Sequence, residues 1–285
     1  MYLYRKNNLI TLSLMLMLDG KFITNYLNDI DDQMSFISNC LIPLACIILA
    51  IQGQLYDLEF KENGQTYKEL ITVDKVNQII VFDVPTHGNR SAATYLKDFI
   101  NRLTVMRDDK AKTCYVWKMK KDEPTPDSVL KALKKVNYKF PQNRYWIETE
   151  NMLPMGVFDL SPYPIIDQFC DKRRVLEVNI YAKITDMERD AKADLLSRYS
   201  NSRVRRALKV KDYTLCDEAS HHKEVTKCYK AGKMNLLSLR CRILDRPKCT
   251  YTVSCKFDPS KSGYFCPDPI HSMTQIHCCD PKCNW

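Results

Sequence analysis

The residues in this 285-residue chain with the clearest capacity for chemistry are its cysteines, of which there are 13. Cys40 and Cys46 lie in an apolar N-terminal stretch, and Cys114 and Cys170 stand alone in the middle of the chain. Nine more are crowded into the last 70 residues: Cys216, Cys228, Cys241, Cys249, Cys255, Cys266, Cys278, Cys279 and Cys283. Such crowding indicates a framework of disulfide bonds and therefore an oxidising compartment.

The number of tail cysteines predicts a further bond. Nine is odd, so four internal bridges leave one thiol over, and we expect this thiol to join two chains as a covalent homodimer. Cys283 is the favoured thiol because it is nearest the C-terminus. The alternative to disulfides is a zinc site with ligands from His271, His277, Cys278, Cys279 and Cys283. The tail has no paired CxxC and no HxxxH spacing, so we expect no metal.

Motifs for catalysis and for cofactor binding are absent from the sequence. GxSxG, HExxH, GxxxxGK[ST] and GxGxxG do not occur, and the chain has only seven glycines. All the histidines fall in expected loops or in the tail: His87, His221, His222, His271 and His277. The adjacent pair His277–Cys278 is expected to belong to the disulfide framework rather than to a nucleophilic site. We therefore expect neither an enzyme nor a cofactor.

Charge in this chain is high but mixed. Lys and Arg number 43 against 34 Asp and Glu, a net charge of +9, and no long basic run occurs. A scattered, solvated surface is the expected arrangement, and no nucleic-acid partner is expected.

The N-terminal region holds two apolar runs that resemble secretory signals, residues 9–18 and residues 40–53. Neither reaches the roughly 20 residues that a transmembrane helix requires. We expect a cleaved signal that ends near Gly53. The alternatives are a signal anchor that leaves the bulk of the chain outside, and a buried core helix. Because Met34 lies shortly before the second run, residues 1–33 can be read as an upstream extension.

Two processing sites are predicted further along the chain. Asn89-Arg90-Ser91 is an acceptor sequence for N-glycosylation. The run Arg203-Val204-Arg205-Arg206 fits the RxRR pattern that convertase-type proteases cut, and it lies in a charged segment before the cysteine-rich tail. The alternative for this run is an uncleaved charged loop.

The middle of the chain reads as alternating strands and helices. Residues 69–85 predict a hairpin. Ser91 can cap a helix whose apolar stripe is Leu96, Phe99, Ile100 and Leu103, with Asp98 beside the stripe. The run "TCYVWKM" predicts a strand, Thr125 and Pro126 begin a second helix, and "RYWIETEN" and "FCDKRRVLEVNIYAKI" predict later strands. The pattern indicates an α+β sheet.

Several of these residues carry a resemblance to a known family. Asp98-Phe99, Thr104, Cys114-Tyr115-Val116 and Phe169-Cys170 occur in the order and setting of a BRICHOS domain. The resemblance covers about residues 69–182, roughly 40% of the chain. It divides the chain into these parts: a signal or anchor (1–53), a linker (54–68), the BRICHOS-like domain (69–182), a charged linker ending in RVRR (183–206) and a cysteine-rich segment (207–285). The cysteine pattern of this tail differs from that of the best-known members.

The resemblance implies a fold and a function. It implies a five-stranded sheet flanked by two helices, with a disulfide between Cys114 and Cys170. It implies that the domain acts as a chaperone for a β-prone client, usually the C-terminal region of its own precursor. Asp98 is the family's distinctive acid, and the sequence leaves open whether it senses pH or is a structural carboxylate.

Three functions are consistent with these observations. The first is a secretory-pathway proprotein, secreted or anchored as a type II membrane protein, whose middle domain protects the C-terminal segment released after Arg206. The stretches 235–244 and 249–257 are the expected client, since they are the most apolar and β-prone parts of the tail, and the second carries little charge. The second is the precursor of a cationic, cysteine-rich peptide with the middle domain as a plain pro-region. The third is an uncleaved extracellular binding module.

Overall fold

The computed structural model describes residues 53–200, 214–216, 218–258, 260 and 263–284. The two N-terminal apolar runs, apart from Gly53, lie outside the described residues, and so do all four residues of the RVRR sequence. Residues from Gly53 onward form one compact unit. None of the helices within the described ranges is long and apolar enough to span a membrane.

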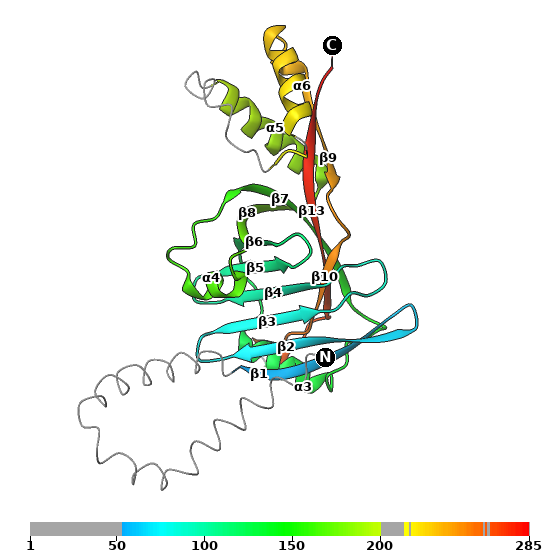
Figure 1. Cartoon of the computed structure of the whole chain (residues 1–285). Coiled ribbons are helices and arrows are strands. Elements are labelled where there is room, and N and C mark those ends of the chain that lie inside the picture. Colours follow the sequence, from blue (N-terminus) through cyan, green and yellow to red (C-terminus); the bar gives the residue numbers. More distant parts are fainter. Residues whose placement is uncertain (1–52, 201–213, 217, 259, 261–262, 285) are drawn as a thin grey trace, which may run out of the picture. The chain divides into compact units, whose positions relative to one another are not determined.

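The first part of this unit is an antiparallel meander whose six strands follow one another in chain order (Figure 1). They are β1 (Gln54–Glu62), β2 (Gln65–Asp74), β3 (Ile79–Val84), β4 (Ala93–Asp98), β5 (Leu103–Asp108) and β6 (Thr113–Lys118). The outer strand β1 alternates buried and exposed side chains, while β4 and β5 are buried almost throughout. This difference is expected for an edge strand and for central strands covered on both faces.

Three hairpin turns of the meander follow one pattern. Each begins with an aspartate that ends its strand, Asp74, Asp98 or Asp108, and the carboxylate of each accepts backbone N–H groups of the turn. A residue with positive φ precedes the next strand in each case: Gln78 (53°), Arg102 (58°) and Lys112 (50°). Aspartate side chains favour such turns because they supply the acceptor that the turn's N–H groups need.

Later parts of the chain extend this sheet and add a separate two-stranded sheet, which is made of the strands 256–258 and 263–265. The middle region adds α3 (Pro126–Lys135), β7 (Trp146–Val157), α4 (Pro164–Cys170) and β8 (Arg174–Tyr181). The C-terminal region adds α5 (Ile184–Ser200), α6 (Glu218–Lys230), the 3-10 turn η2 (Met234–Leu236), β9 (Leu237–Ile243), β10 (Lys248–Thr252), β11 (Lys256–Asp258), β12 (Gly263–Phe265) and β13 (Ile270–Cys283). β8 is parallel to β6, and β7 is antiparallel to β8. The first part of β13 lies parallel to β7 and antiparallel to β10, and its second part pairs with β9.

Three clusters of apolar side chains form the core. The largest joins one face of the meander to α3 and to β10 and β13 of the tail, so tail and middle domain share it. The second lies under α5 and α6 against β9 and the end of β13. The third packs Cys114 and other apolar side chains of the meander against α4, which ends at Cys170. The fold is therefore α+β with a mixed sheet, and the tail is part of that sheet.

Several expectations from the sequence are corrected by this fold. The main sheet has eleven strands rather than five, because β1 precedes the expected domain, that domain supplies seven strands (β2–β8) and three tail strands join the sheet. Residues 54–68 form β1 and the start of β2 instead of a linker, and residues 184–200 form α5. The expected helix around Leu96 is β4, a turn and β5. Strands that are buried on both faces have continuous apolar runs. The apolar residues of such a run here also fall at the i, i+3, i+4 and i+7 positions of a helix.

The helix after Thr125 is confirmed. The Thr125 hydroxyl accepts the backbone N–H of Ser128 at 3.3 Å, and Pro126 occupies the first turn of α3. This start has a local cause, since both residues act on the N–H groups that a helix leaves unpaired at its N-terminus.

Candidate functional site

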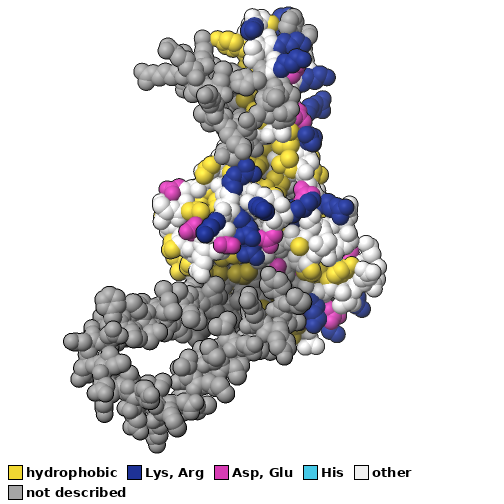
Figure 2. Space-filling model, in the orientation of Figure 1, with side chains coloured by type: hydrophobic (Ala, Val, Ile, Leu, Met, Phe, Trp, Pro, Cys, Tyr) yellow, Lys and Arg dark blue, Asp and Glu magenta, His cyan; other side chains and the backbone are white. Residues whose placement is uncertain are grey.

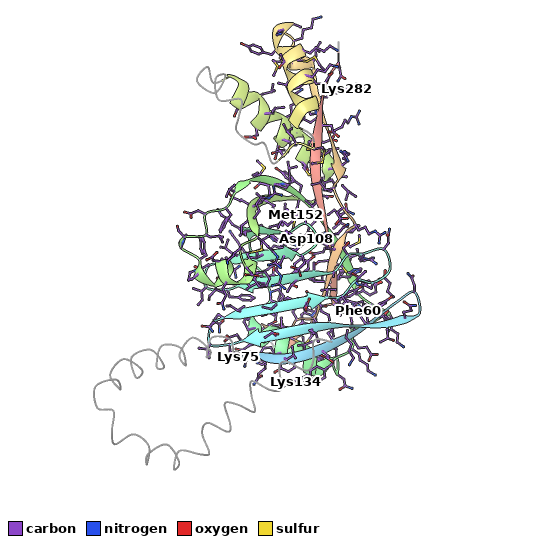
Figure 3. The ribbon with its side chains drawn as sticks, in the orientation of Figure 1. Phe60, Lys75, Asp108, Lys134, Met152 and Lys282 are labelled. Carbon is purple, nitrogen blue, oxygen red and sulfur yellow. A yellow bond between two sulfur atoms is a disulfide. The ribbon has the colours of Figure 1, made fainter. Side chains whose placement is uncertain are left out.

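The C-terminal residues 247–256, which we call the docked segment, lie over the meander and α3. This segment includes most of 249–257, one of the two β-prone stretches that the sequence predicts as the client. Every residue of β10 is buried, and so are Val253, Ser254 and Cys255. The ring of Tyr251 stacks on that of Phe60 with 3.9 Å between centroids. Phe60 and Asp108, both labelled in Figure 3, belong to the surface that holds the segment, which we call the docking face.

One edge of the docked segment pairs with β13, and among the described strands none pairs with the opposite edge. Groups of the middle domain bind this free edge instead. The backbone N–H of Ser91 donates to the carbonyl of Pro247 at 3.1 Å, and the carboxyl of Glu69 accepts the N–H of Tyr251 at 3.0 Å. Further along, the Ser128 hydroxyl accepts the N–H of Cys255 at 3.1 Å and donates to the carbonyl of the same residue. The docking face therefore satisfies backbone groups that an open strand edge would expose.

Glu69 has an unusual position for a carboxylic acid. It lies on β2 and is 0% exposed. Burial raises its pKa well above the ordinary value, and the hydrogen bond from Tyr251 opposes this rise only in part. A raised pKa favours the neutral acid, which can still accept the N–H of Tyr251.

A buried ion pair fixes the start of the docked segment. Lys248 Nζ lies 2.8 Å from an oxygen of Asp108, and the two side chains are 1% and 2% exposed. Asp245 lies 3.7 Å from the same ammonium group. Charges so far from water require partners, so this pair specifies where Lys248 must sit on the sheet.

His87 joins the loop after β3 to two side chains of β10. Its Nδ1 lies 2.7 Å from the carbonyl of Pro85, which can only accept, so this nitrogen carries the proton. Its Nε2 lies 3.2 Å from both Cys249 Sγ and Tyr251 Oη. Burial lowers the pKa of His87 and raises that of Cys249 to about 12. A neutral thiol beside a neutral imidazole lacks the thiolate that nucleophilic cysteines use.

Two hollows border the docked segment. One has a volume of about 130 Å³, and its lining combines Arg90 and Tyr145 of the middle domain with Tyr251 and His271 of the tail. Burial lowers the pKa of His271 to about 4. The other is about 210 Å³ and lies between Lys97 and Glu123 on one side and residues of β10 and β13 on the other. Within the described ranges, no three His, Cys, Asp or Glu side chains are grouped as a metal site would require.

The residues that carry the BRICHOS resemblance lie elsewhere on the sheet. Cys114 and Cys170 form a disulfide with 6.0 Å between their Cα atoms, which is the pairing that the resemblance implies. Asp98 is 1% exposed and ends β4 rather than belonging to a helix. One of its oxygens accepts the N–H groups of Ile100 and Asn101, each at 3.0 Å. The predicted glycosylation residue Asn89 is exposed in the loop between β3 and β4.

The tail disulfides form a set of their own. Cys216 bonds to Cys278, Cys228 to Cys283, Cys241 to Cys279 and Cys255 to Cys266. The expectation that Cys283 is the unpaired thiol is wrong, because Cys228 lies close enough to bond it. The free cysteine of the described residues is Cys249, which is buried. No disulfide in the described residues crosses position 206, so none ties the tail to the middle domain.

The docking face was not found by sequence reasoning, although one signal for it was present. In β2 the side chains of Glu69, Ile71 and Val73 are all buried and recur at every second position. An acid in the core-facing series of an alternating strand indicates a buried carboxyl with a specific partner.

Comparisons with models of protein families, with curated proteins and with solved structures found no match to this chain.

Proposed function

We propose that this chain is a secretory-pathway proprotein whose BRICHOS-like middle domain acts as an intramolecular chaperone for its own C-terminal segment. The observation that carries the proposal is the free edge of the docked segment. Its backbone groups at Pro247, Tyr251 and Cys255 are all bonded by Ser91, Glu69 and Ser128 of the middle domain. A β-prone strand with an occupied edge cannot pair with another chain.

The disulfides support release of the tail as a second step. Because each described disulfide lies wholly before or wholly after residue 206, a cut there separates two parts that are held only by non-covalent contacts. The tail can complete its own bonds while the docking face protects it. Five disulfides also favour the oxidising secretory compartment.

The test uses the fragment that ends at Arg206, obtained by convertase cleavage of the full chain. Thioflavin fluorescence follows aggregation of a reduced peptide spanning residues 235–257, with the fragment below stoichiometric amounts. We expect the fragment to delay aggregation, and we expect a variant with Glu69→Ala and Ser128→Ala to delay it less. Glu177→Ala is the matched control, because Glu177 is exposed on β8. No delay beyond that of an unrelated disulfide-bonded protein of similar size contradicts the chaperone role.

A cationic peptide released from a plain pro-region is the second candidate. Figure 2 shows dark blue basic side chains along the end of the molecule that contains α6, β9 and β13. Lys230, Arg240 and Lys282 are exposed there, and Lys282 is labelled in Figure 3. Mass spectrometry of secreted material tests release, since the peptide would begin at Ala207. Secreted chains that all remain intact favour the third candidate, an extracellular binding module whose tail stays in the sheet.

A further inference from the structure

Two neighbouring turns of the meander present bare apolar tips to solvent. The side chains of Val76 and Ile100 are 90% and 67% exposed. We call these two residues the apolar tips. Each follows the aspartate of its turn by two positions, and its backbone N–H donates to the carboxylate of that aspartate at 3.0 Å. The buried aspartates Asp74 and Asp98 therefore hold both tips in a fixed, outward position. Exposing large apolar side chains on ordered turns has a cost in water that a partner would relieve.

The strand register places both tips at one end of the sheet. β2 and β4 run in the same direction, since each is antiparallel to β3 between them, so the turns after Asp74 and Asp98 lie side by side (Figure 1). Gln54 pairs with Val73, which puts the start of β1 at the same end. Leu55, the next residue, is 63% exposed. Lys75, labelled in Figure 3, marks this end, which we call the turn edge.

Basic side chains accompany the apolar tips. Lys75 and Arg102 belong to the two turns, and Lys118 and Lys121 follow at the end of β6, where Lys118 pairs with Leu103. Lys75 is bonded to Asp127 at 2.6 Å. Among the residues that the structure describes, no carboxylate lies within salt-bridge distance of Arg102, Lys118 or Lys121. Apolar tips with cations beside them match the interface of an anionic bilayer, where the tips meet acyl chains and the cations meet headgroups.

The sequence before Gly53 supports a bilayer as the partner of this surface. Gly53 begins the described unit at the turn edge, and the sequence that directly precedes it, "CLIPLACIILAI" over residues 40–51, has no charged residue. We propose that the turn edge, made of Leu55, Val76 and Ile100 with the basic residues around them, is a binding surface for anionic lipid bilayers.

The test uses protein that begins at Gly53, so that the preceding apolar run cannot supply the binding. Flotation with phosphatidylcholine vesicles, with and without phosphatidylserine, measures the bound fraction. We expect binding to vesicles that contain phosphatidylserine, and a loss of at least about tenfold when Val76→Asp and Ile100→Asp are combined. Val157→Asp is the matched control, since Val157 is 65% exposed on β7, and it should bind as the parent does.

A second pair, Val76→Ser and Ile100→Ser, keeps the test valid if the aspartates disturb the turns, and circular dichroism checks the fold of each variant. The proposal is overturned if the parent protein does not bind, if binding survives in both double variants, or if Val157→Asp weakens it equally. It is also overturned if gel filtration shows that the tips join two copies of the chain and flotation shows that both double variants still bind vesicles.

Discussion

Lys248 and Asp108 form an ion pair that joins the tail to the meander at a point excluded from water, with 2.8 Å between nitrogen and oxygen. Removing one partner leaves the other charge buried without compensation. We expect Lys248→Met to lower the free energy of unfolding by about 3–5 kcal/mol. Combining it with Asp108→Leu should restore part of the loss, since the double variant has no unpaired charge at this pair but also lacks the acceptor for the N–H of Ala111. Urea denaturation of the single and double variants measures this coupling, and simple addition of two losses would show that the pair does not act as a unit.

Glu69 should make stability depend on pH in an unusual direction. Its pKa in the folded state is raised well above the ordinary value, mainly by burial. The acid therefore costs stability as pH rises above the unfolded pKa of about 4.3, and this cost grows until the folded pKa is reached. Glu69→Gln keeps an acceptor for the N–H of Tyr251 but cannot ionise.

We therefore expect Glu69→Gln to be more stable than the parent near neutral pH and nearly equal to it at about pH 4, below the ordinary pKa of the acid. Urea denaturation across this range measures the difference. Glu177→Gln, on the exposed side of β8, serves as the control and should follow the parent at every pH. A Glu69→Gln variant that is less stable at neutral pH would show that the ionised carboxylate binds the docked segment.

Local signals made part of the fold predictable. The start of α3 was predicted because Thr125 and Pro126 act on groups within one helical turn. The hairpin of β2 and β3 was predicted because its strands are rich in β-branched residues and a polar turn separates them. The turn at Asp98 was missed because the central strands β4 and β5 lack the alternation that marks a half-buried strand.

The contacts that the sequence does not predict join residues far apart in the chain. The contact between Glu69 and Tyr251 joins residues 182 positions apart, and that between Ser128 and Cys255 joins residues 127 apart. Neither residue type nor spacing in a single sequence specifies such partners. The same limit applies to the tail cysteines, because several connectivities satisfy the same count and only the fold places Cys283 beside Cys228.

Asp98 should be important for the stability of its turn. It is almost fully buried and accepts two backbone N–H groups and the side-chain amide of Asn101. Asp98→Ala leaves these donors without their acceptor, so we expect a loss of about 1–2 kcal/mol in the free energy of unfolding. Asp74→Ala, in the matching turn, should cost a similar amount. If Asp98→Ala leaves stability unchanged while Asp74→Ala reduces it, the acid at position 98 has another role than closing the turn.

Cleavage after Arg206 should yield two parts that separate without a reducing agent. The described disulfides pair Cys114 with Cys170 before the cut, and the tail cysteines only with one another after it. We expect two bands on a non-reducing denaturing gel of cleaved protein, and one band for Arg206→Ala treated in the same way. A cleaved sample that stays in one band until it is reduced would reveal a bond between the middle domain and the tail.

The thiol of Cys249 should report whether the docked segment is in place. In the folded chain it is 1% exposed, and burial raises its pKa to about 12, so it is neither accessible nor ionised. We expect protein that begins at Gly53 to react with maleimide only after urea unfolds it, and to remain monomeric on non-reducing gels while folded. Lys248→Met weakens the hold on β10 and should speed the reaction in native buffer, whereas Lys256→Met, which changes an exposed lysine of the same segment, should not. Equal labelling rates in both variants would show that opening of the docked segment does not limit access to Cys249. Covalent dimers that form in the native parent would show that this thiol is reached without release of the strand.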